Sequence, residues 1–180
     1  VNPATGSLTI SPDGRTAFAA LTAGTSAWVD LAEGRILHQD DLGLEPARTA
    51  LSPDGRRLAV AANTGEVGLL QLETWTWTRP PTAAHSAVAL GVTWAADGTL
   101  FASYGQDGRI SLWDGRTGEP LGTVRLGGPS ALTSADFMPD GHTLIIATSD
   151  REVFTWDTRV ESWVERACAI AGRNLTTDEW

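Results

Sequence analysis

The carboxylates best suited to chemistry in this sequence recur at regular intervals, and each precedes a glycine. Two carboxylates roughly 5 to 10 Å apart can perform general acid/base catalysis, for example at a glycosidic bond. Here successive aspartates are 41, 43 and 43 residues apart, so each structural repeat holds one of them. This spacing is too wide for such a pair, whereas Asp-Gly steps favour tight turns. We therefore interpret as turn residues Asp13, Asp54, Asp97 and Asp140.

The other reactive side chain types form no recognised catalytic arrangement. His38, His85 and His142 occupy different positions within the repeats, so we do not expect them to converge on a metal ion. A single cysteine, Cys168, excludes an internal disulfide. The GxSxG turn of hydrolases and the GxxxxGK phosphate loop are both missing from the sequence, and Ser103 is better explained as a structural partner of His85. The sequence predicts no catalytic residue, metal or cofactor.

The charge balance argues against polyanionic partners. The 180 residues include 22 acidic and 13 basic side chains, which give a formal net charge of −9. Such a charge opposes binding to nucleic acid and to anionic lipid. No apolar run reaches the roughly 18 residues of a membrane-spanning helix, and residues 1–3 do not begin a signal sequence. We expect a cytoplasmic segment whose partners are proteins.

The spacing of the Asp-Gly steps indicates a repeat protein. Within each interval the apolar runs have the length of strands, which favours propeller blades, because a small sheet must stack on neighbours to bury its faces. The sequence therefore predicts an all-β fold in residues 1–157, with four blades and about fifteen strands, followed by a tail over 158–180. The expected blades are approximately 6–43, 44–86, 87–129 and 130–157.

Two Trp-Asp steps and two Ser-Pro-Asp-Gly turns resemble the WD40 repeat family. The steps are Trp113-Asp114 and Trp156-Asp157, and the turns are 11–14 and 52–55. The resemblance covers residues 6 to about 157 and implies part of a WD40-type β-propeller. Because about seven blades are usual in the family, it also implies further blades of the same parent chain, whose N-terminal strand would complete the last blade.

The third blade matches the family pattern most fully. An Ala-His step ends at His85, twelve residues before Asp97, where the family has Gly-His. The resemblance implies a structural tetrad in which hydrogen bonds connect Asp107, His85, Ser103 and Trp113. Such a chain would satisfy a buried imidazole, hydroxyl and indole N–H together.

The other blades depart from this pattern. Val29-Asp30 and Leu70-Gln71 replace the Trp-Asp step, and none of these blades has a histidine in the tetrad position, although Asp150 keeps the acidic one. We expect blades one, two and four to be less rigid than blade three. The residues expected at WD-type turns are Asp30, Trp113, Asp114, Trp156 and Asp157.

Helical periodicity begins after the fourth blade. Trp163 and Ala167 fall on one helical face, and Gly172 is the expected stop. Within the tail, residues 166–180 resemble the short helical ending of bacterial, often actinobacterial, multidomain WD40 proteins. In those proteins the propeller follows an NTPase-type signalling or regulatory module, sometimes with a DNA-binding or kinase domain. Capping-box spacing is found at Thr158 with Glu161 and at Thr176 with Glu179.

Most of the eight tryptophans fall at repeat positions and are expected in the core. Trp75 and Trp77 differ, because alternation in an outermost strand places both on one face. Two alternatives remain for them: packing between blades two and three, or an exposed aromatic patch.

The rim formed by loops between blades, and by loops between second and third strands, suits protein recognition. We interpret the chain as an interaction or sensing module of a bacterial regulatory or signalling protein. The alternatives are a propeller enzyme, such as a lactonase or quinone-dependent dehydrogenase, for which the innermost runs offer only Asp136 as an ionisable group, and a purely structural spacer. The candidate partner-binding residues on the rim are Asp40, Asp41, Tyr104, Gln106 and Arg151.

Overall fold

Apolar runs alternate with polar turns along the chain, and each run forms a strand that pairs antiparallel with the next strand of the same blade. The computed structural model describes residues 7–20, 25–125 and 132–171. Blade one contains β1 (Ser7–Ile10), β2 (Thr16–Ala20), β3 (Thr25–Asp30) and β4 (Arg35–Asp41). Blade two contains β5 (Pro46–Leu51), β6 (Arg57–Ala62), β7 (Glu66–Gln71) and β8 (Thr76–Ala83). Blade three contains β9 (Ala89–Trp94), β10 (Leu100–Gly105), β11 (Arg109–Asp114) and β12 (Pro120–Arg125), and blade four β13 (Leu132–Phe137), β14 (Thr143–Thr148) and β15 (Val153–Asp157).

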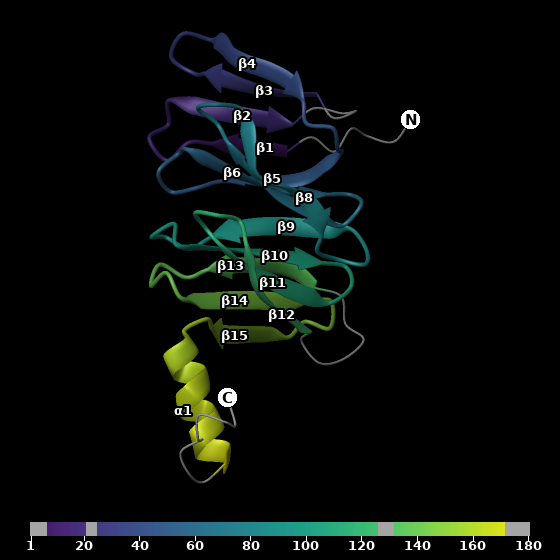
Figure 1. Cartoon of the computed structure of the whole chain (residues 1–180), viewed down its shortest axis with the longest axis vertical. Helices are drawn as coiled ribbons and strands as arrows, with labels where there is room; N and C mark the ends of the chain where they lie inside the picture. Colours follow the sequence, from purple (N-terminus) through teal and green to yellow (C-terminus); the bar gives the residue numbers. More distant parts are fainter. Residues whose placement is uncertain (1–6, 21–24, 126–131, 172–180) are drawn as a thin grey trace.

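The strands lie in chain order within every sheet. The prediction of four blades and about fifteen strands is confirmed, since the described residues form fifteen strands in four sheets. Blade four is a three-stranded sheet in the described part of the chain, with β15 at its outer edge. One helix, α1 (Val160–Ala171), follows β15 and extends away from the sheets (Figure 1).

The Asp-Gly steps form the turns between the first and second strands. Their glycines have φ between 68° and 77°, in the region where a β-carbon is disfavoured. In each turn the aspartate accepts a hydrogen bond from the backbone N–H two residues later, as Asp54 does from Arg56 at 3.1 Å. This geometry shows the aspartates as local acceptors that fix the turn.

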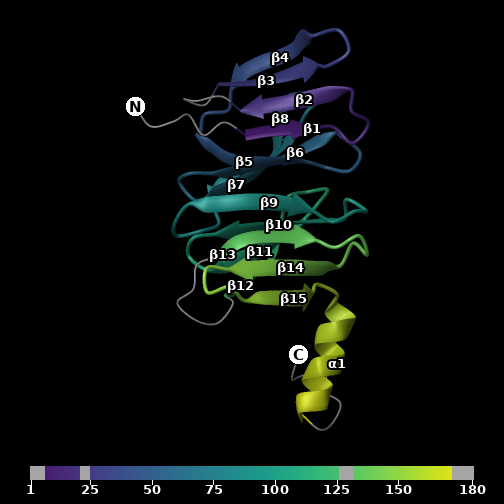
Figure 2. The ribbon, with the colours of Figure 1, turned by 180° about the vertical axis from the view of Figure 1, so that it is seen from behind.

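Successive blades follow one another along the length of the molecule (Figures 1 and 2). Buried apolar side chains fill each of the three junctions between neighbouring blades. Phe18, Leu58 and Leu70 belong to the junction of blades one and two, Phe101 and Trp113 to that of blades two and three. The third junction is formed by Ile110, Leu112, Leu132, Leu144 and Ile146.

Side-chain hydrogen bonds connect the innermost strands of successive blades. We call this set of contacts the inner seam. It joins β1 to β5, β5 to β9 and β9 to β13, so each blade is tied to the next one along the chain. The inner seam is defined by one pair at each junction, namely Ser7 with Thr49 (3.0 Å), Trp94 with the carbonyl of Ala50 (3.0 Å), and Thr93 with Asp136. At the first junction Thr9 also donates to the carbonyl of Thr49 at 2.8 Å.

Trp75 and Trp77 pack at a different junction from the one proposed as an alternative. Both are half-buried against the apolar cluster of blades one and two, not between blades two and three. Strand β8 begins at Thr76, and Trp75 lies in the preceding turn with φ 53°. Its ring centroid is 4.1 Å from that of His38, which belongs to blade one.

The capping box predicted at Thr158 and Glu161 is wrong. Both the backbone N–H and the hydroxyl of Thr158 donate to the carbonyl of His142, at 2.9 and 2.8 Å. Thr158 therefore extends the pairing of blade four, and the carboxylate of Asp157 instead accepts from the hydroxyl of Ser162 at 2.6 Å. Gly172 and the second capping box lie outside the described residues.

Candidate functional site

A chain of hydrogen bonds crosses blade three at its buried centre. The hydroxyl of Ser103, on β10, lies 2.9 Å from Nε2 of His85, and Nδ1 of His85 lies 3.2 Å from a carboxylate oxygen of Asp107. The indole N–H of Trp113, on β11, donates to the same hydroxyl at 3.0 Å. The structure thus brings the four residues of the expected tetrad together. A β-carbon at Gly105 would lie 2.6 Å from His85 Nδ1, which explains the glycine there.

Within this hydrogen-bond chain, the surroundings of His85 favour its neutral imidazole form. Burial lowers the pKa of His85, although the carboxylate of Asp107 acts in the opposite direction. For Asp107, burial opposes ionisation, but hydrogen bonds from Ser86 N–H and His85 outweigh it and lower the pKa overall. Since an ionised carboxylate only accepts, His85 donates through Nδ1–H and accepts the Ser103 hydroxyl at Nε2. Every polar group of the tetrad then has a hydrogen-bond partner. This arrangement indicates a structural role for Ser103 and His85 rather than the roles of nucleophile and base.

Blade one shows what happens where the pattern is incomplete. The indole nitrogen of Trp28 is buried and has no hydrogen-bond partner among the described residues. A buried donor without a partner costs about 1–3 kcal/mol. The comparison with Trp113 shows how the tetrad provides an acceptor for a buried indole.

The aspartates that close the third strands cap the turns that follow. Asp114 accepts hydrogen bonds from the backbone N–H groups of Arg116 and Thr117, at 2.9 and 2.7 Å. Asp30 accepts equivalently in blade one, and Asp157 binds Arg159 in blade four. Blade two has Gln71 at this position.

Four of the five candidate rim residues are exposed. Asp40 and Asp41 end β4, Gln106 follows β10, and Arg151 lies between β14 and β15. In each antiparallel sheet the second and fourth strands run in the same direction and end on the same rim. These positions lie at or after the end of a second or a fourth strand, so they belong to one rim. No hydrogen bond between described residues joins one side chain of this group to another, apart from local contacts at Asp40 and Asp41. The rim is thus a series of separate positions spread over the blades.

Tyr104 and Arg151 have particular local roles on this rim. The ring of Tyr104 is half-buried over Gly91, where a β-carbon would lie 2.5 Å from Cζ, and it packs against the core of blades three and four. Arg151 has φ 67° and closes its turn by donating its backbone N–H to Thr148. Blades two and three have Gly65 and Gly108 in the equivalent turns, so Arg151 adopts a conformation that favours glycine.

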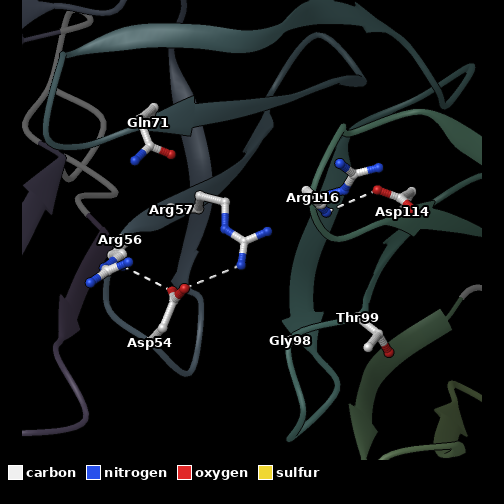
Figure 3. Close-up of a pocket in the computed structure, with 8 residues that line it drawn as sticks. All are labelled: Asp54, Arg56, Arg57, Gln71, Gly98, Thr99, Asp114 and Arg116. Carbon is white, nitrogen blue, oxygen red and sulfur yellow. Dashed lines mark hydrogen bonds and ion pairs between the residues drawn. The ribbon is translucent and has the colours of Figure 1, made fainter.

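The opposite rim carries a groove between blades two and three that the sequence did not single out (Figure 3). Its volume is about 490 Å³. Blade two provides one wall through its Asp-Gly turn and the end of β7, and blade three provides the other. The lining residues are Asp54, Arg56, Arg57, Gln71, Gly98, Thr99, Asp114 and Arg116. We call this the interblade groove.

Arg57 joins the two walls of the interblade groove. Its guanidinium pairs with Asp54 at 3.2 Å in blade two, donates to the carbonyl of Gly115 in blade three, and lies 5.6 Å from the ring centroid of Trp94. Only 18% of its side chain is exposed, so Arg57 stabilises the junction between the two blades. In contrast, the guanidinium groups of Arg56 and Arg116 have no hydrogen bond or ion pair with a described side chain, and both residues are exposed.

A signal for the groove was present in the repeats. Arg56 follows Asp54-Gly55 directly and Arg116 follows Asp114-Gly115, so each arginine is the first residue after an aspartate-glycine step. Aligning the turns of different types would have revealed the recurrence. That both residues line one groove, however, depends on how blade two packs against blade three.

The innermost strands offer two ionisable side chains, one more than the sequence analysis predicted. Strand β5 begins at Pro46 and so includes Arg48. The other is Asp136 on β13, whose carboxylate accepts the hydroxyl of Thr93. Among the described residues, no group of three or more His, Cys, Asp or Glu is arranged to hold a metal ion. Nor does the described helical segment have the length and apolarity to cross a membrane.

Consecutive antiparallel sheets of three or four strands, packed face to face and joined along their innermost strands, define a β-propeller architecture. A solved structure of the Kuenenia stuttgartiensis hydrazine synthase has a similar fold, with a TM-score of 0.73 and 15% identity. The similarity covers 86% of this chain and 51% of that one. At this identity the likeness concerns the fold alone.

The model of the "WD domain, G-beta repeat" family matches residues 78–114 and 118–157. WD repeat-containing protein 1 of Xenopus tropicalis is 36% identical over 86 residues, and protein NEDD1 of Homo sapiens is 35% identical over 79 residues. The matched segments cover 46% and 43% of this chain but only 14% and 12% of those proteins. A longer match, 29% identical over 135 residues, links 72% of this chain to 42% of WD repeat-containing protein SL1-17 of Schistosoma mansoni.

Two segments of this chain therefore match WD40 repeats, and the comparisons support a WD40 repeat family for it. Its repeats form a module of the kind that mediates protein–protein interaction. The two matched segments begin in β8 and reach the end of β15, so they cover the blade with the complete hydrogen-bond chain and the blade that follows it.

Proposed function

We propose that this chain is a non-catalytic interaction or sensing module whose partner binds the rim formed by Asp40, Asp41, Tyr104, Gln106 and Arg151. The observation that carries the proposal is that the exposed rim residues are distinct from the buried residues that hold the blades together. Asp40 is exposed at the end of β4, and Gln106 and Arg151 are exposed on connections, whereas the blades are held by buried clusters and the inner seam. Such connections can vary without loss of the core, which suits recognition.

We further propose a cytoplasmic bacterial regulatory or signalling protein as the context, with an NTPase or kinase module on the same parent chain. The resemblance of residues 166–180 to the ending of such proteins supports this context. Further blades of the parent chain would complete the ring. The partner is a protein, because the net charge of −9 disfavours nucleic acid and anionic membranes.

A pull-down of partners by the chain tests the rim. We expect the variants Asp40→Ala with Asp41→Ala, Gln106→Ala and Arg151→Ala to reduce recovery of a specific partner by about tenfold, since hot-spot contacts carry most binding energy. Tyr104 is changed to Phe, because its ring also packs against the core. Glu33→Ala, an exposed change on the opposite rim, is the matched control. Unchanged recovery by every rim variant would count against the assignment.

A further inference from the structure

We propose that the interblade groove is a second docking site, which binds an acidic peptide segment of a partner protein through the side chains of Arg56 and Arg116. This inference deepens the proposed function, because it names the chemistry of a partner segment. It concerns the rim opposite to the one proposed above and rests on different residues.

The charge of the groove is opposite to that of the chain. Three arginines and two aspartates line it, whereas the whole molecule has a net charge of −9. Both aspartates are already engaged in turns. Asp54 accepts the hydroxyl of Ser52 at 2.5 Å, and Asp114 accepts Thr117 N–H at 2.7 Å. These two carboxylates therefore stabilise the turns that form the walls of the groove. The charged groups that remain available to a ligand are the guanidinium groups.

The substitution of Gln71 for the family aspartate contributes to this charge. In the other three blades an aspartate ends the third strand and caps the following turn, namely Asp30, Asp114 and Asp157. In blade two the same position carries an uncharged amide that lines the groove. Figure 3 shows Gln71 on the same side of the groove as Arg57 and Arg56, with Arg116 on the other side. An amide there removes one negative charge and adds a hydrogen-bond donor.

The two free guanidinium groups determine the chemical class of the ligand. Each guanidinium can donate two parallel hydrogen bonds to a carboxylate, which makes arginine well suited to recognise acidic side chains. Arg56 lies on the wall of blade two and Arg116 on that of blade three, so a ligand that contacts both must cross the groove. Arg57 stays bound to Asp54 and Gly115 and keeps the walls in place.

An extended peptide fits this surface better than an enclosed small ligand. Asp54, Arg56 and Arg116 are all exposed, so the groove is lined by surface side chains rather than closed by a buried shell. The volume of about 490 Å³ lies within the usual range for ligand sites, about 300–1,000 Å³. Nucleic acid is the less favoured polyanion, because a duplex or long strand would meet the negative charge of the remaining surface.

The test is a fluorescence anisotropy titration of the full chain with a labelled decapeptide of alternating Glu and Gly. We expect binding that weakens at high salt, and Arg56→Gln combined with Arg116→Gln should weaken it about tenfold. Arg15→Gln combined with Arg125→Gln is the matched control, since it removes the same charge from exposed arginines outside the groove. Arg15 follows the Asp-Gly turn of blade one as Arg56 follows that of blade two.

Several results would overturn the proposal. Equal loss of affinity in the control variant would show a general effect of charge, and equal binding of a Gln–Gly decapeptide would show that carboxylates are not recognised. Absence of binding at millimolar peptide, or tighter groove-dependent binding of a single-stranded oligodeoxynucleotide, would also reject it. Thermal melting monitors the fold of both variants. Because the rim residues are untouched, these outcomes leave the pull-down test of the proposed function independent.

Discussion

At the scale of single residues, aspartates in this chain act as ionised hydrogen-bond acceptors in turns. Asp140 illustrates the effect: hydrogen bonds from Thr143 and from the N–H of His142 outweigh desolvation and lower its pKa to about 2. The pKa values of Asp13 and Asp157 are lowered for the same reason, by Ser11 and by Arg159 respectively. The charged form is thus part of the folded turn.

The stability of the chain should therefore decrease in acid, and Asp140→Asn should show how much of this comes from one turn. A carboxyl with a lowered pKa in the folded state stabilises the fold above its unfolded pKa of about 3.9, and this contribution is lost as the pH falls towards about 2. We expect the variant to be less stable than the wild type at pH 7 and equally stable near the lower limit. Urea unfolding across this range measures the gap. A gap that stays constant with pH would contradict the prediction.

The residues that bear on function differ in how visible they are from sequence. His85, Ser103, Asp107 and Trp113 could be proposed because they lie within one repeat at spacings typical of WD40 blades. Arg56 and Arg116 are 60 positions apart in different blades, and the sequence does not show that their turns face the same groove. Contacts between blades depend on packing that a one-dimensional pattern does not contain.

At the scale of elements, the hydrogen-bond chain ties the segment before β9 to β10, the turn after it and β11. We expect blade three to open less readily than blade one in hydrogen exchange. His85→Ala would remove the acceptor of the buried Ser103 hydroxyl and one donor to the Asp107 carboxylate, at a cost of about 1–3 kcal/mol. The amides of β10 should then exchange roughly tenfold faster or more.

His142→Ala is the control for this experiment. His142 is partly exposed and pairs with Asp140 at 3.2 Å, so its removal should change stability by less than about 1 kcal/mol. The amides of β2, in blade one, report on global effects in both variants. If β10 in the wild type exchanged as fast as β2, the idea of a more rigid third blade would be wrong.

Element boundaries show where the sequence was informative. The strands followed from alternation between Asp-Gly turns, because such turns demand a positive φ that the sequence reveals. The capping box at Thr158 failed because the carbonyl of His142, just before the neighbouring strand β14, accepts from both donors of that residue. Alternation alone predicts Trp75 in a strand, whereas it lies in the turn before β8. Its contact with His38 of blade one is tertiary and leaves no local pattern in the sequence.

At the scale of the whole molecule, the first and last blades each present an apolar face to solvent. In blade one, Leu8 is 69% and Ile10 55% exposed, and in blade four Val153 is 63% exposed. The same faces of the inner blades are covered by their neighbours. Exposed apolar faces of this kind favour association.

The isolated chain should therefore self-associate as its concentration increases. Light scattering is expected to show a mass above 19.1 kDa, the mass of one chain. Leu8→Thr combined with Ile36→Thr, which makes one exposed face more polar, should shift association to a concentration severalfold higher. Thr9→Ser, on the face that points towards blade two, is the control. A monodisperse monomer at every concentration would contradict this prediction.

The inner seam limits where residues can be inserted into the chain. Its paired residues are separated by 42, 44 and 43 positions, which is nearly the length of one repeat. A residue inserted within an innermost strand would turn every later side chain of that strand to the opposite face and break the pair. A residue inserted in a rim connection leaves both partners in register. Growth and diversification are thus confined to the rims, where both proposed docking sites lie.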